Sequence, residues 1–415
     1  MNGRSFAWRL AAAMAGALAL RLLYTVAVAG DDFSPGRQGD FIFFHQVANL
    51  IADGKGFVSP YTIEYFHRSP PSAEHPPLWP LLLSASSKLG FKSILAHRLV
   101  GVPLGVATVG VLGLIGRRLA GERAGLAVAS IAAVHPLLIA ADGSLMSETL
   151  FGLCVAAALL AALRLLERPT AGRAAMLGAA IGLAALTRGE GLLLLLLLAL
   201  PAAWAAGRER RAVRIAAALL AAAIVIAPWT VRNWTAFDQP VLLSTNDSTV
   251  LTGANCDRTY HGRDLGYWRV DCRTRITKEN EAEQAAIWRR HGLRYARRHA
   301  GRLVAVVAPV RVLRTWGVWQ PARQVHEAEG RDFTMERLGI AVYFLLLPLA
   351  AWGALLLRRR GGPLWVLLVP PGLVTVVSAL AYGYTRFRHP ADLAIVVLAG
   401  LALAQLGQRR AIGST

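Results

Sequence analysis

The sequence has few of the residues on which disulfide-rich and metal-binding folds depend. Only three of its 415 residues are cysteine, and their spacing matches no metal-site pattern. A glycine-rich nucleotide-binding motif is also missing. No internal repeat is recognisable, which argues against transporters built from inverted repeats, because the two halves of such proteins share a pattern of interrupted spans.

Acidic residues are scarce as well, with 25 Asp and Glu against 45 Lys and Arg, and a formal net charge of +20. The positive charge is spread over many short loops, whereas nucleic-acid binding calls for a basic patch on one face. Apolar residues, by contrast, make up 55% of the chain and recur in Leu/Ala runs of membrane-span length. The composition predicts an all-α polytopic membrane protein that does not bind nucleic acid.

Ten segments are expected to cross the bilayer, and their bounds are approximate. They are 10–30, 94–116, 123–140, 149–166, 174–187, 190–206, 213–231, 336–357, 363–383 and 390–406. Arginines cluster in every second loop, on the side of the N-terminus, as expected for a cytoplasmic side. One alternative for the first segment stays open: Ala27-Val28-Ala29 resembles a signal-peptide cleavage site.

This topology divides the chain into three parts. Residues 1–231 form an N-terminal transmembrane catalytic module, which includes the first outward loop, 31–93. Residues 232–335 form a long outward loop, and 336–415 form the C-terminal transmembrane helices. In the long loop, 287–319 mixes Trp, Leu, Val and Arg, and is read either as an amphipathic helix on the membrane or as a solvated face that touches headgroups.

Four further residues have expected structural partners or environments. Arg21 lies deep in the first span, where a charge is costly unless it is paired, so it is expected to face the bundle interior. Cys256 and Cys272 share the long outward loop, and an oxidising compartment on that side would favour a disulfide between them. Cys154 lies in an apolar segment and is expected to pack there as a small side chain.

The first outward loop gathers carboxylates, histidines and aromatic residues between two spans. Asp40 opens the segment DFIFFHQVANLIA, whose apolar residues recur at helical spacing. Asp40 should therefore begin an amphipathic helix at the membrane interface, where a carboxylate also suits the helix N-terminus. Two interpretations are open for this residue: a reactive carboxylate, or an N-terminal cap without chemistry.

The loop resembles the first outer loop of the GT-C glycosyltransferases, which include protein O-mannosyltransferases and aminoarabinose transferases that act on lipid A. The resemblance rests on Gly39-Asp40, the following aromatics, the turn Gly54-Lys55-Gly56-Phe57, and Glu74-His75-Pro76-Pro77-Leu78. Such enzymes pass a sugar from a polyprenyl-phosphate carrier to an acceptor outside the membrane. The resemblance implies that Asp40 is the general base. Many members have a second acid directly after that Asp, where this chain has Phe41.

Later stretches resemble the superfamily in the same order along the chain. They are Ser147-Glu148, Arg188 in ALTRGEG, the run 228–233 (PWTVRN) with 243–246 (LSTN), and 384–390 (YTRFRHP). The residues thereby expected to bind the donor phosphate are His75, Arg188, Arg232, Arg386 and Arg388. Those expected to bind substrate are His45, Glu74, Glu148 and Asn246. The alternatives are an N-cap pair for Ser147-Glu148, a helix-start histidine for His75, and headgroup-binding for each arginine.

The resemblance implies an inverting glycosyltransferase in a bacterial inner membrane, with its active site facing outward. The donor would be a polyprenyl-phosphate-linked sugar, and the acceptor a hydroxyl of a glycan, lipid or protein. A flippase of lipid-linked sugars and a non-catalytic membrane scaffold are the alternatives. The residues demand no cofactor and form no metal-ligand cluster, although a divalent cation near Glu148 or Asp40 is compatible with the chemistry.

Overall fold

The computed structural model describes residues 3–31, 39–327 and 329–413; residues 32–38 of the first outward loop lie outside this part. The described backbone is helical, and within it the single β-type bridge joins Val58 to Pro71. The expectation of an all-α membrane protein is confirmed.

Six of the described helices are long and apolar enough to cross a membrane, two of them together with a short adjoining turn. They are α1 (Gly3–Tyr24, extended by a π-helical turn to Ala29), α5 (Ile94–Ala120), α8 (Glu148–Glu167), α11 (Arg211–Phe237), α18 (Phe333–Arg359) and α20 (His389–Gly413, preceded by the 3-10 turn Thr385–Arg388). A bent pair, α6 (Glu122–Val134) and α7 (Pro136–Asp142), would make a seventh.

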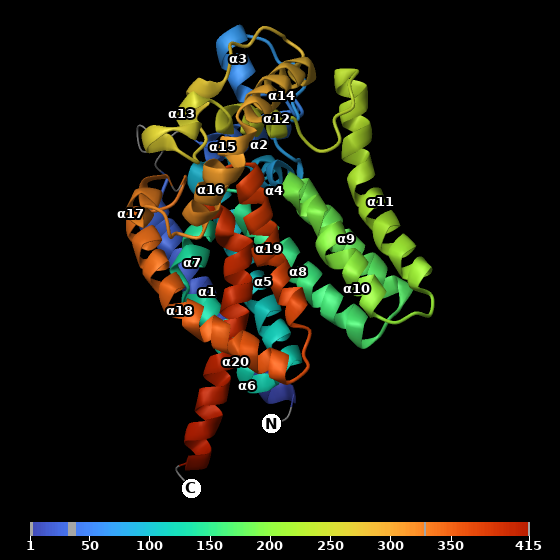
Figure 1. Ribbon diagram of the computed structural model, residues 1–415, viewed down its shortest axis with the longest axis vertical. Coiled ribbons are helices and arrows are strands. Elements are labelled where there is room, and N and C mark those ends of the chain that lie inside the picture. Colours follow the sequence, from blue (N-terminus) through green and yellow to red (C-terminus); the bar gives the residue numbers. More distant parts are fainter. Residues whose placement is uncertain (1–2, 32–38, 328, 414–415) are drawn as a thin grey trace.

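Shorter apolar helices occupy the other expected spans. They are α9 (Ala171–Thr187), the stretch 189–205 ending in α10 (Leu200–Ala205), and α19 (Leu364–Leu380). Each of the ten expected segments is thus helical, while ten crossings remain a prediction. In Figure 1, α1 begins and α20 ends at the same lower end, as an even number of crossings requires.

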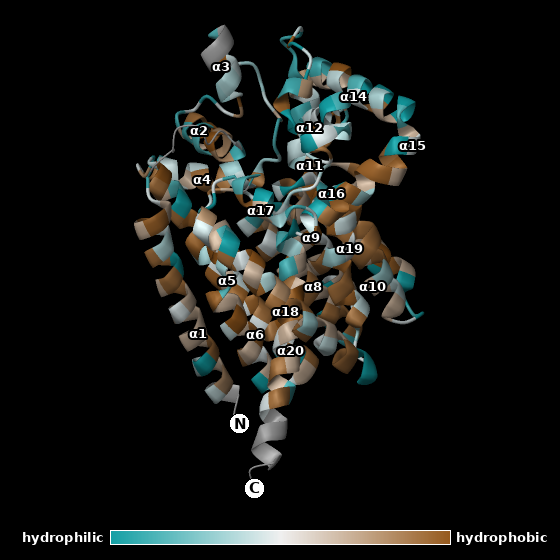
Figure 2. Cartoon of the chain, turned by 60° about the vertical axis from the view of Figure 1, so that its left-hand side comes forward, coloured by the Kyte–Doolittle hydropathy of each residue, from teal (hydrophilic) through white to brown (hydrophobic). Residues whose placement is uncertain are grey.

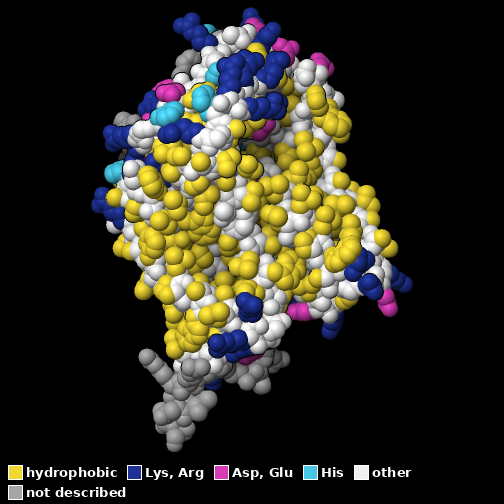
Figure 3. Space-filling view, viewed as in Figure 1, with side chains coloured by type: hydrophobic (Ala, Val, Ile, Leu, Met, Phe, Trp, Pro, Cys, Tyr) yellow, Lys and Arg dark blue, Asp and Glu magenta, His cyan; other side chains and the backbone are white. Residues whose placement is uncertain are grey.

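The surface shows where a bilayer would lie. Polar residues gather at the upper end in Figure 2, above a bundle in which hydrophobic residues predominate. In Figure 3 a broad hydrophobic band separates the basic side chains of the upper and lower ends. Because the helices α11 and α18 expose large side chains such as Leu220, Ile224 and Leu345, their surface suits contact with lipid.

The bundle is closed by backbone contact at small residues, as is usual for helices in membranes. A Cβ on Gly178 of α9 would lie 1.9 Å from the carbonyl oxygen of Ala218 in α11, and one on Gly353 of α18 equally close to that of Leu398 in α20. Helix α20 also packs on α6, α5 and α8. The segments 1–231 and 336–415 therefore contribute to one bundle.

The break between α6 and α7 brings a carboxylate to a buried arginine. Pro136 cannot continue a helix and sits at the first turn of α7, which is bent by 60° from α6. At the end of α7, Asp142 accepts a hydrogen bond of 2.6 Å from Arg21 Nε, and both side chains are almost fully buried. The expected pairing of Arg21 inside the bundle is observed.

Amphipathic helices form the polar layer over the bundle's outward end. The first outward loop folds into α2 (Asp40–Ala52), α3 (Pro60–Phe66) and α4 (Leu78–Lys88). Helix α2 packs on α4 and buries the apolar face that its sequence predicts: Phe41, Phe44, Val47 and Ala48. The predicted helix from Asp40 is confirmed.

The long outward loop folds into a compact cover. It contains α12 (Asn246–Ala254), α13 (Asp257–Tyr260), α14 (Glu281–Arg298), α15 (Ala300–Arg302), α16 (Ala308–Thr315) and α17 (Pro321–Gln324). The stretch 287–319 is not one helix, because α14 ends at Arg298. The apolar face of α14 packs on α12, because a Cβ on Gly292 of α14 would lie 2.4 Å from the carbonyl oxygen of Leu251 in α12. Arg289 of α14 pairs with Asp247 of α12 at 2.7 Å, whereas Arg290, Arg294, Arg297 and Arg298 are exposed.

Cysteine usage follows the same division between cover and bundle. Cys256 and Cys272 form a disulfide in the long outward loop, with their Cα atoms 5.9 Å apart. Cys154 is a free, buried thiol in α8. A thiol-reactive dye would therefore reach a cysteine only when the bundle opens.

The Arg21–Asp142 pair gives a stability test. Asp142→Ala would leave the buried Arg21 unpaired and should destabilise the bundle by about 3–5 kcal/mol. Glu167→Ala removes the partner of Arg118 at the surface and should cost at most about 1 kcal/mol. Thermal exposure of Cys154 to a fluorogenic maleimide in detergent measures both, and equal midpoints for the two variants would contradict the structural role of the pair.

Candidate functional site

A buried arginine collects three carboxylates from distant parts of the chain. Arg386, in the turn before α20, is 3% exposed. Its Nη1 lies 3.1 Å from Glu329 Oε2 and 3.6 Å from Glu148 Oε1, and its Nη2 lies 3.6 Å from Asp40 Oδ2. We call this group, together with His75 and Arg188, the Arg386 cluster.

Asp40 is held at the first residue of α2. Gly39 is the N-cap residue, so the alternative of Asp40 as a cap is wrong. Its Oδ1 lies 3.7 Å from His75 Nε2, and the side chain is 40% exposed. The imidazole of His75 packs against the rings of Phe43 and Phe44. Burial lowers the pKa of His75, although the charge of Asp40 acts the other way, so His75 is neutral at pH 7.

Glu148 and Arg188 complete the buried side of the cluster. Glu148 begins α8, is 2% exposed and lies 3.1 Å from Arg188 Nη1. Arg188 follows α9 and also bonds Glu190 through Nε at 2.6 Å. Ser147 is the N-cap residue of α8 but makes no side-chain capping bond, and its Oγ instead accepts a hydrogen bond of 3.4 Å from Arg188 Nη1.

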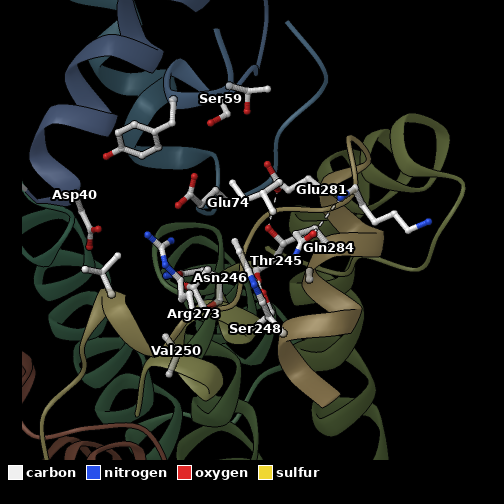
Figure 4. Close-up of a pocket in the computed structure, with 18 of the residues that line it drawn as sticks. Asp40, Ser59, Glu74, Thr245, Asn246, Ser248, Val250, Arg273, Glu281 and Gln284 are labelled. Atoms are coloured by element: carbon white, nitrogen blue, oxygen red, sulfur yellow. Dashed lines mark hydrogen bonds between the residues drawn. The ribbon is translucent and has the colours of Figure 1, made fainter. Parts of the chain in front are cut away.

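A cavity of about 1170 Å³ opens from the cluster between the first outward loop and the long one. Asp40, Glu329 and Arg386 line one part of it. Figure 4 shows Asp40 on one side, Glu281 on the other, and Glu74 and Arg273 between them. The cavity is large enough for a ligand of substrate size and offers it both charged and hydroxyl groups.

The middle of the cavity holds two carboxyl groups, Glu74 and Glu281. Glu281 accepts bonds from the backbone N–H of Ala73 at 2.8 Å and from Thr245 Oγ1 at 2.7 Å. Burial, and after it the nearby Glu281, raise the pKa of Glu74 to about 8, while Arg273 acts in the opposite direction. Glu74 is therefore a neutral carboxylic acid at pH 7, able to donate a hydrogen bond to a ligand.

Known proteins resemble this chain in part of its sequence and in its fold. Residues 74–232 match the family described as dolichyl-phosphate-mannose-protein mannosyltransferase. The structure resembles the archaeal oligosaccharyltransferase AglB from Archaeoglobus fulgidus in complex with an inhibitory peptide and a dolichol-phosphate, with a TM-score of 0.58 and 15% identity over 98% of this chain. The chain has the GT-C fold.

The likeness to AglB has a defined extent. The chain covers 52% of that AglB chain, so it spans about half its length. An AglB complex with zinc and sulfate gives a TM-score of 0.58 at 15% identity, over 96% of this chain and 49% of that one. ArnT from Cupriavidus metallidurans bound to undecaprenyl phosphate gives a TM-score of 0.46 at 15% sequence identity, over 98% of this chain and 79% of that one. No curated protein sequence is significantly similar.

The GT-C fold brings some of the sequence-predicted residues together and separates others. Asp40, His75, Glu148, Arg188 and Arg386 meet in the cluster, and Glu74 and Asn246 line the cavity. Arg232 instead donates to the carbonyl oxygens of Ser72 at 2.9 Å and Phe57 at 3.0 Å. Arg388 pairs with Asp392 at 2.8 Å. Their roles in phosphate binding remain predictions.

His45 also faces away from the cavity. Its Nδ1 lies 3.0 Å from Nδ1 of His97, whose Nε2 in turn contacts Ser87 Oγ at 2.8 Å. This chain of polar groups ties α2 to α4 and to the start of α5. His45 therefore supports the helix that carries Asp40, and its expected role in substrate binding remains a prediction.

Sequence reasoning missed Glu329, Arg273 and Glu281. Glu329 is a second carboxylate beside Asp40, and it comes from the end of the long loop instead of the next residue in sequence. Burial raises its pKa, against the lowering effect of Arg386. One signal was available: Glu329, like Arg386, lies just before the outward end of a span.

The carboxylates of the site gather around a guanidinium. In the described ranges no three His, Cys, Asp or Glu side chains are placed to hold a metal ion. The carboxylates that a divalent cation would need already converge on Arg386. The guanidinium supplies positive charge to these three carboxylates.

The raised pKa of Glu74 predicts a pH-dependent stability. Because the folded chain binds this proton more tightly than the unfolded chain, stability should fall as pH rises from the ordinary value of 4.5 towards 8. Glu74→Gln should flatten that loss, while Glu279→Gln, on the exposed rim of the cavity, should not. Thermal unfolding followed by tryptophan fluorescence between pH 5 and 9 measures this, and parallel curves for all three proteins would refute it.

Proposed function

We propose that this protein is a glycosyltransferase that moves a sugar from a polyprenyl phosphate to a hydroxyl group on the outer face of the membrane. The observation that supports it best is the placement of Asp40: its half-exposed carboxylate faces a large cavity while Arg386 and His75 hold it from behind. The GT-C fold and the family match of residues 74–232 agree with this activity.

In the proposed reaction Asp40 acts as the general base. It accepts the proton of the acceptor hydroxyl as the oxygen attacks the anomeric carbon of the donor sugar. The new carbon–oxygen bond forms as the bond to the lipid phosphate breaks, and the electron pair leaves with the phosphate. A single displacement from the opposite side inverts the anomeric configuration.

The link between Asp40 and Arg386 couples proton uptake to phosphate departure. When Asp40 takes up the proton, its negative charge disappears and its attraction for Arg386 Nη2 weakens. That edge of the guanidinium then becomes available to the charge that develops on the leaving phosphate. Such charge stabilisation, by a group already in place, is a large contribution in many enzymes. Glu148 and Glu329 keep Arg386 in position during the step.

Glu329 is the second candidate for the base. It lines the same cavity and lies 3.1 Å from Arg386. Burial raises the pKa of Glu329, against the lowering effect of Arg386, so Glu329 holds a proton more readily than an ordinary glutamate and is less suited to act as a base. We assign it to the support of Arg386 and to the hydrogen-bonding of the donor.

The location of the site also favours a lipid-linked donor. The cluster lies at the ends of α8, α9 and α20 that meet the first outward loop and the long one. A polyprenyl chain could remain in lipid while its phosphate reaches Arg386 and Arg188. The AglB structure includes a dolichol-phosphate, a carrier of the same chemical class. We place the protein in a bacterial inner membrane, with this site outside.

Replacement of Asp40 tests the proposal. Asp40→Asn should lower sugar transfer from a panel of radiolabelled polyprenyl-phosphate sugars about 10²- to 10⁴-fold, because it removes the base. Donor binding should persist. Asp53→Asn is the matched control, since Asp53 caps the other end of α2 and pairs with Lys92 at the surface.

Each outcome identifies a different function or residue. Full transfer by Asp40→Asn with loss in Glu329→Gln would move the base to Glu329. Transfer from no donor, together with movement of a labelled donor across proteoliposomes, would assign the protein to the flippase class. Charged pairs inside the bundle, such as Arg21–Asp142 and Arg388–Asp392, are what that alternative would use.

The charge supplied by Arg386 predicts the response to metal removal. Transfer should survive dialysis against EDTA within about twofold, because a guanidinium already compensates the three carboxylates. Arg386→Gln should lower transfer at least about 10²-fold. Loss of activity in EDTA, restored by a divalent cation, would show that a metal ion and not Arg386 carries this role.

A further inference from the structure

One basic side chain in the cavity lacks an acidic partner. The cavity is lined by four: Arg68, Arg273, Lys278 and Arg386. Arg68 pairs with Glu279, Lys278 lies 3.7 Å from Glu283, and Arg386 holds its three carboxylates. Across residues 39–327 and the other described ranges, Arg273 forms no ion pair and no side-chain hydrogen bond. An unsatisfied guanidinium that faces a cavity is available to a ligand.

The guanidinium of Arg273 is held in place by two indole rings. Its central carbon lies 5.8 Å from the ring centre of Trp268 and 5.5 Å from that of Trp288, within the range of cation–π attraction. Both rings are themselves fixed: Trp268 donates to the carbonyl oxygen of Thr249 at 2.8 Å, and Trp288 to that of Thr274 at 3.1 Å. Little side-chain freedom would be lost when a ligand binds.

The backbone beside Arg273 is also constrained. Cys272, its neighbour, is bonded to Cys256 at the start of α13. A Cβ on Gly253 of α12 would lie 2.1 Å from the indole nitrogen of Trp268, so only glycine leaves room for that ring. The disulfide and the glycine therefore position the arginine and its tryptophan neighbour from two sides.

We propose that Arg273, with Trp268 and Trp288, forms a subsite that binds a carboxylate or phosphate group on the acceptor. This inference rests on the proposed function and specifies its acceptor as an anionic one. The planar guanidinium offers paired N–H donors that match either group, while the indoles give an apolar surface for the adjoining ring or chain of the ligand.

The position of the subsite favours the acceptor over the donor. Arg273, Trp268 and Trp288 all belong to the long outward loop, whereas Arg386 and Arg188 lie at the ends of the apolar helices. A lipid-bound phosphate reaches the helix ends first. Figure 4 shows Arg273 in the same cavity as Asp40, with Glu74 beside it. Since Glu74 is neutral at pH 7, it does not repel an anion there.

Equilibrium binding to the full-length protein in detergent tests this directly. Calorimetric titration with glucose 6-phosphate and with glucose compares an anionic sugar with a neutral one. The wild-type protein should bind the phosphate ester at least about tenfold more tightly. Arg273→Gln should abolish that preference and Arg273→Lys should restore part of it. Arg275→Gln is the matched control, because Arg275 is exposed in the same loop.

Competition with farnesyl phosphate separates the two sources of a phosphate group. Retained binding of glucose 6-phosphate at saturating farnesyl phosphate supports an acceptor subsite, and competitive displacement would overturn it in favour of the donor. Equal binding by Arg273→Gln and the wild-type protein, or no preference over glucose, would also overturn it. Because this readout needs no transfer, it separates failure of the subsite from failure of the proposed activity.

Discussion

The site depends on one buried interaction, the contact of the Arg386 guanidinium with the carboxylates of Asp40, Glu148 and Glu329. A buried cation is costly unless acids surround it, and three acids this close repel one another without the cation. The guanidinium and the three carboxylates therefore stabilise one another in the buried site. Because the four residues belong to the starts of α2 and α8, the end of the long loop and the turn before α20, this contact also fixes how the outward cover sits on the bundle.

The cavity separates two chemical environments that lipid-linked transfer would need to join. At one side, the charged groups of the Arg386 cluster form ion pairs with one another at the ends of apolar helices. At the other, a neutral Glu74, the hydroxyl-bonded Glu281 and the unpaired Arg273 face a space covered by the long loop. A membrane-bound donor and its acceptor would approach Asp40 from these different directions.

The partners of the arginines could not be predicted from local sequence. Arg188, Arg232, Arg386 and Arg388 all follow similar motifs at outward span ends, and the sequence treats them alike. In the structure two of them join the cluster, one binds the carbonyl oxygens of Ser72 and Phe57, and one pairs with Asp392. The role of a guanidinium is decided by the nearest acid or carbonyl, and that neighbour is set by packing between distant segments.

The sequence by itself determined the helical segments, the helix beginning at Asp40 and the place of Arg21 inside the bundle. These follow from periodicity, span length and the cost of a lone charge in lipid, which act over a few turns of chain. Only the tertiary structure decided that Glu329 lies at Asp40, that α7 bends to bring Asp142 to Arg21, and that Arg273 faces the cavity unpaired. Such contacts join residues far apart in sequence, and their energies appear only once the bundle and its cover have packed.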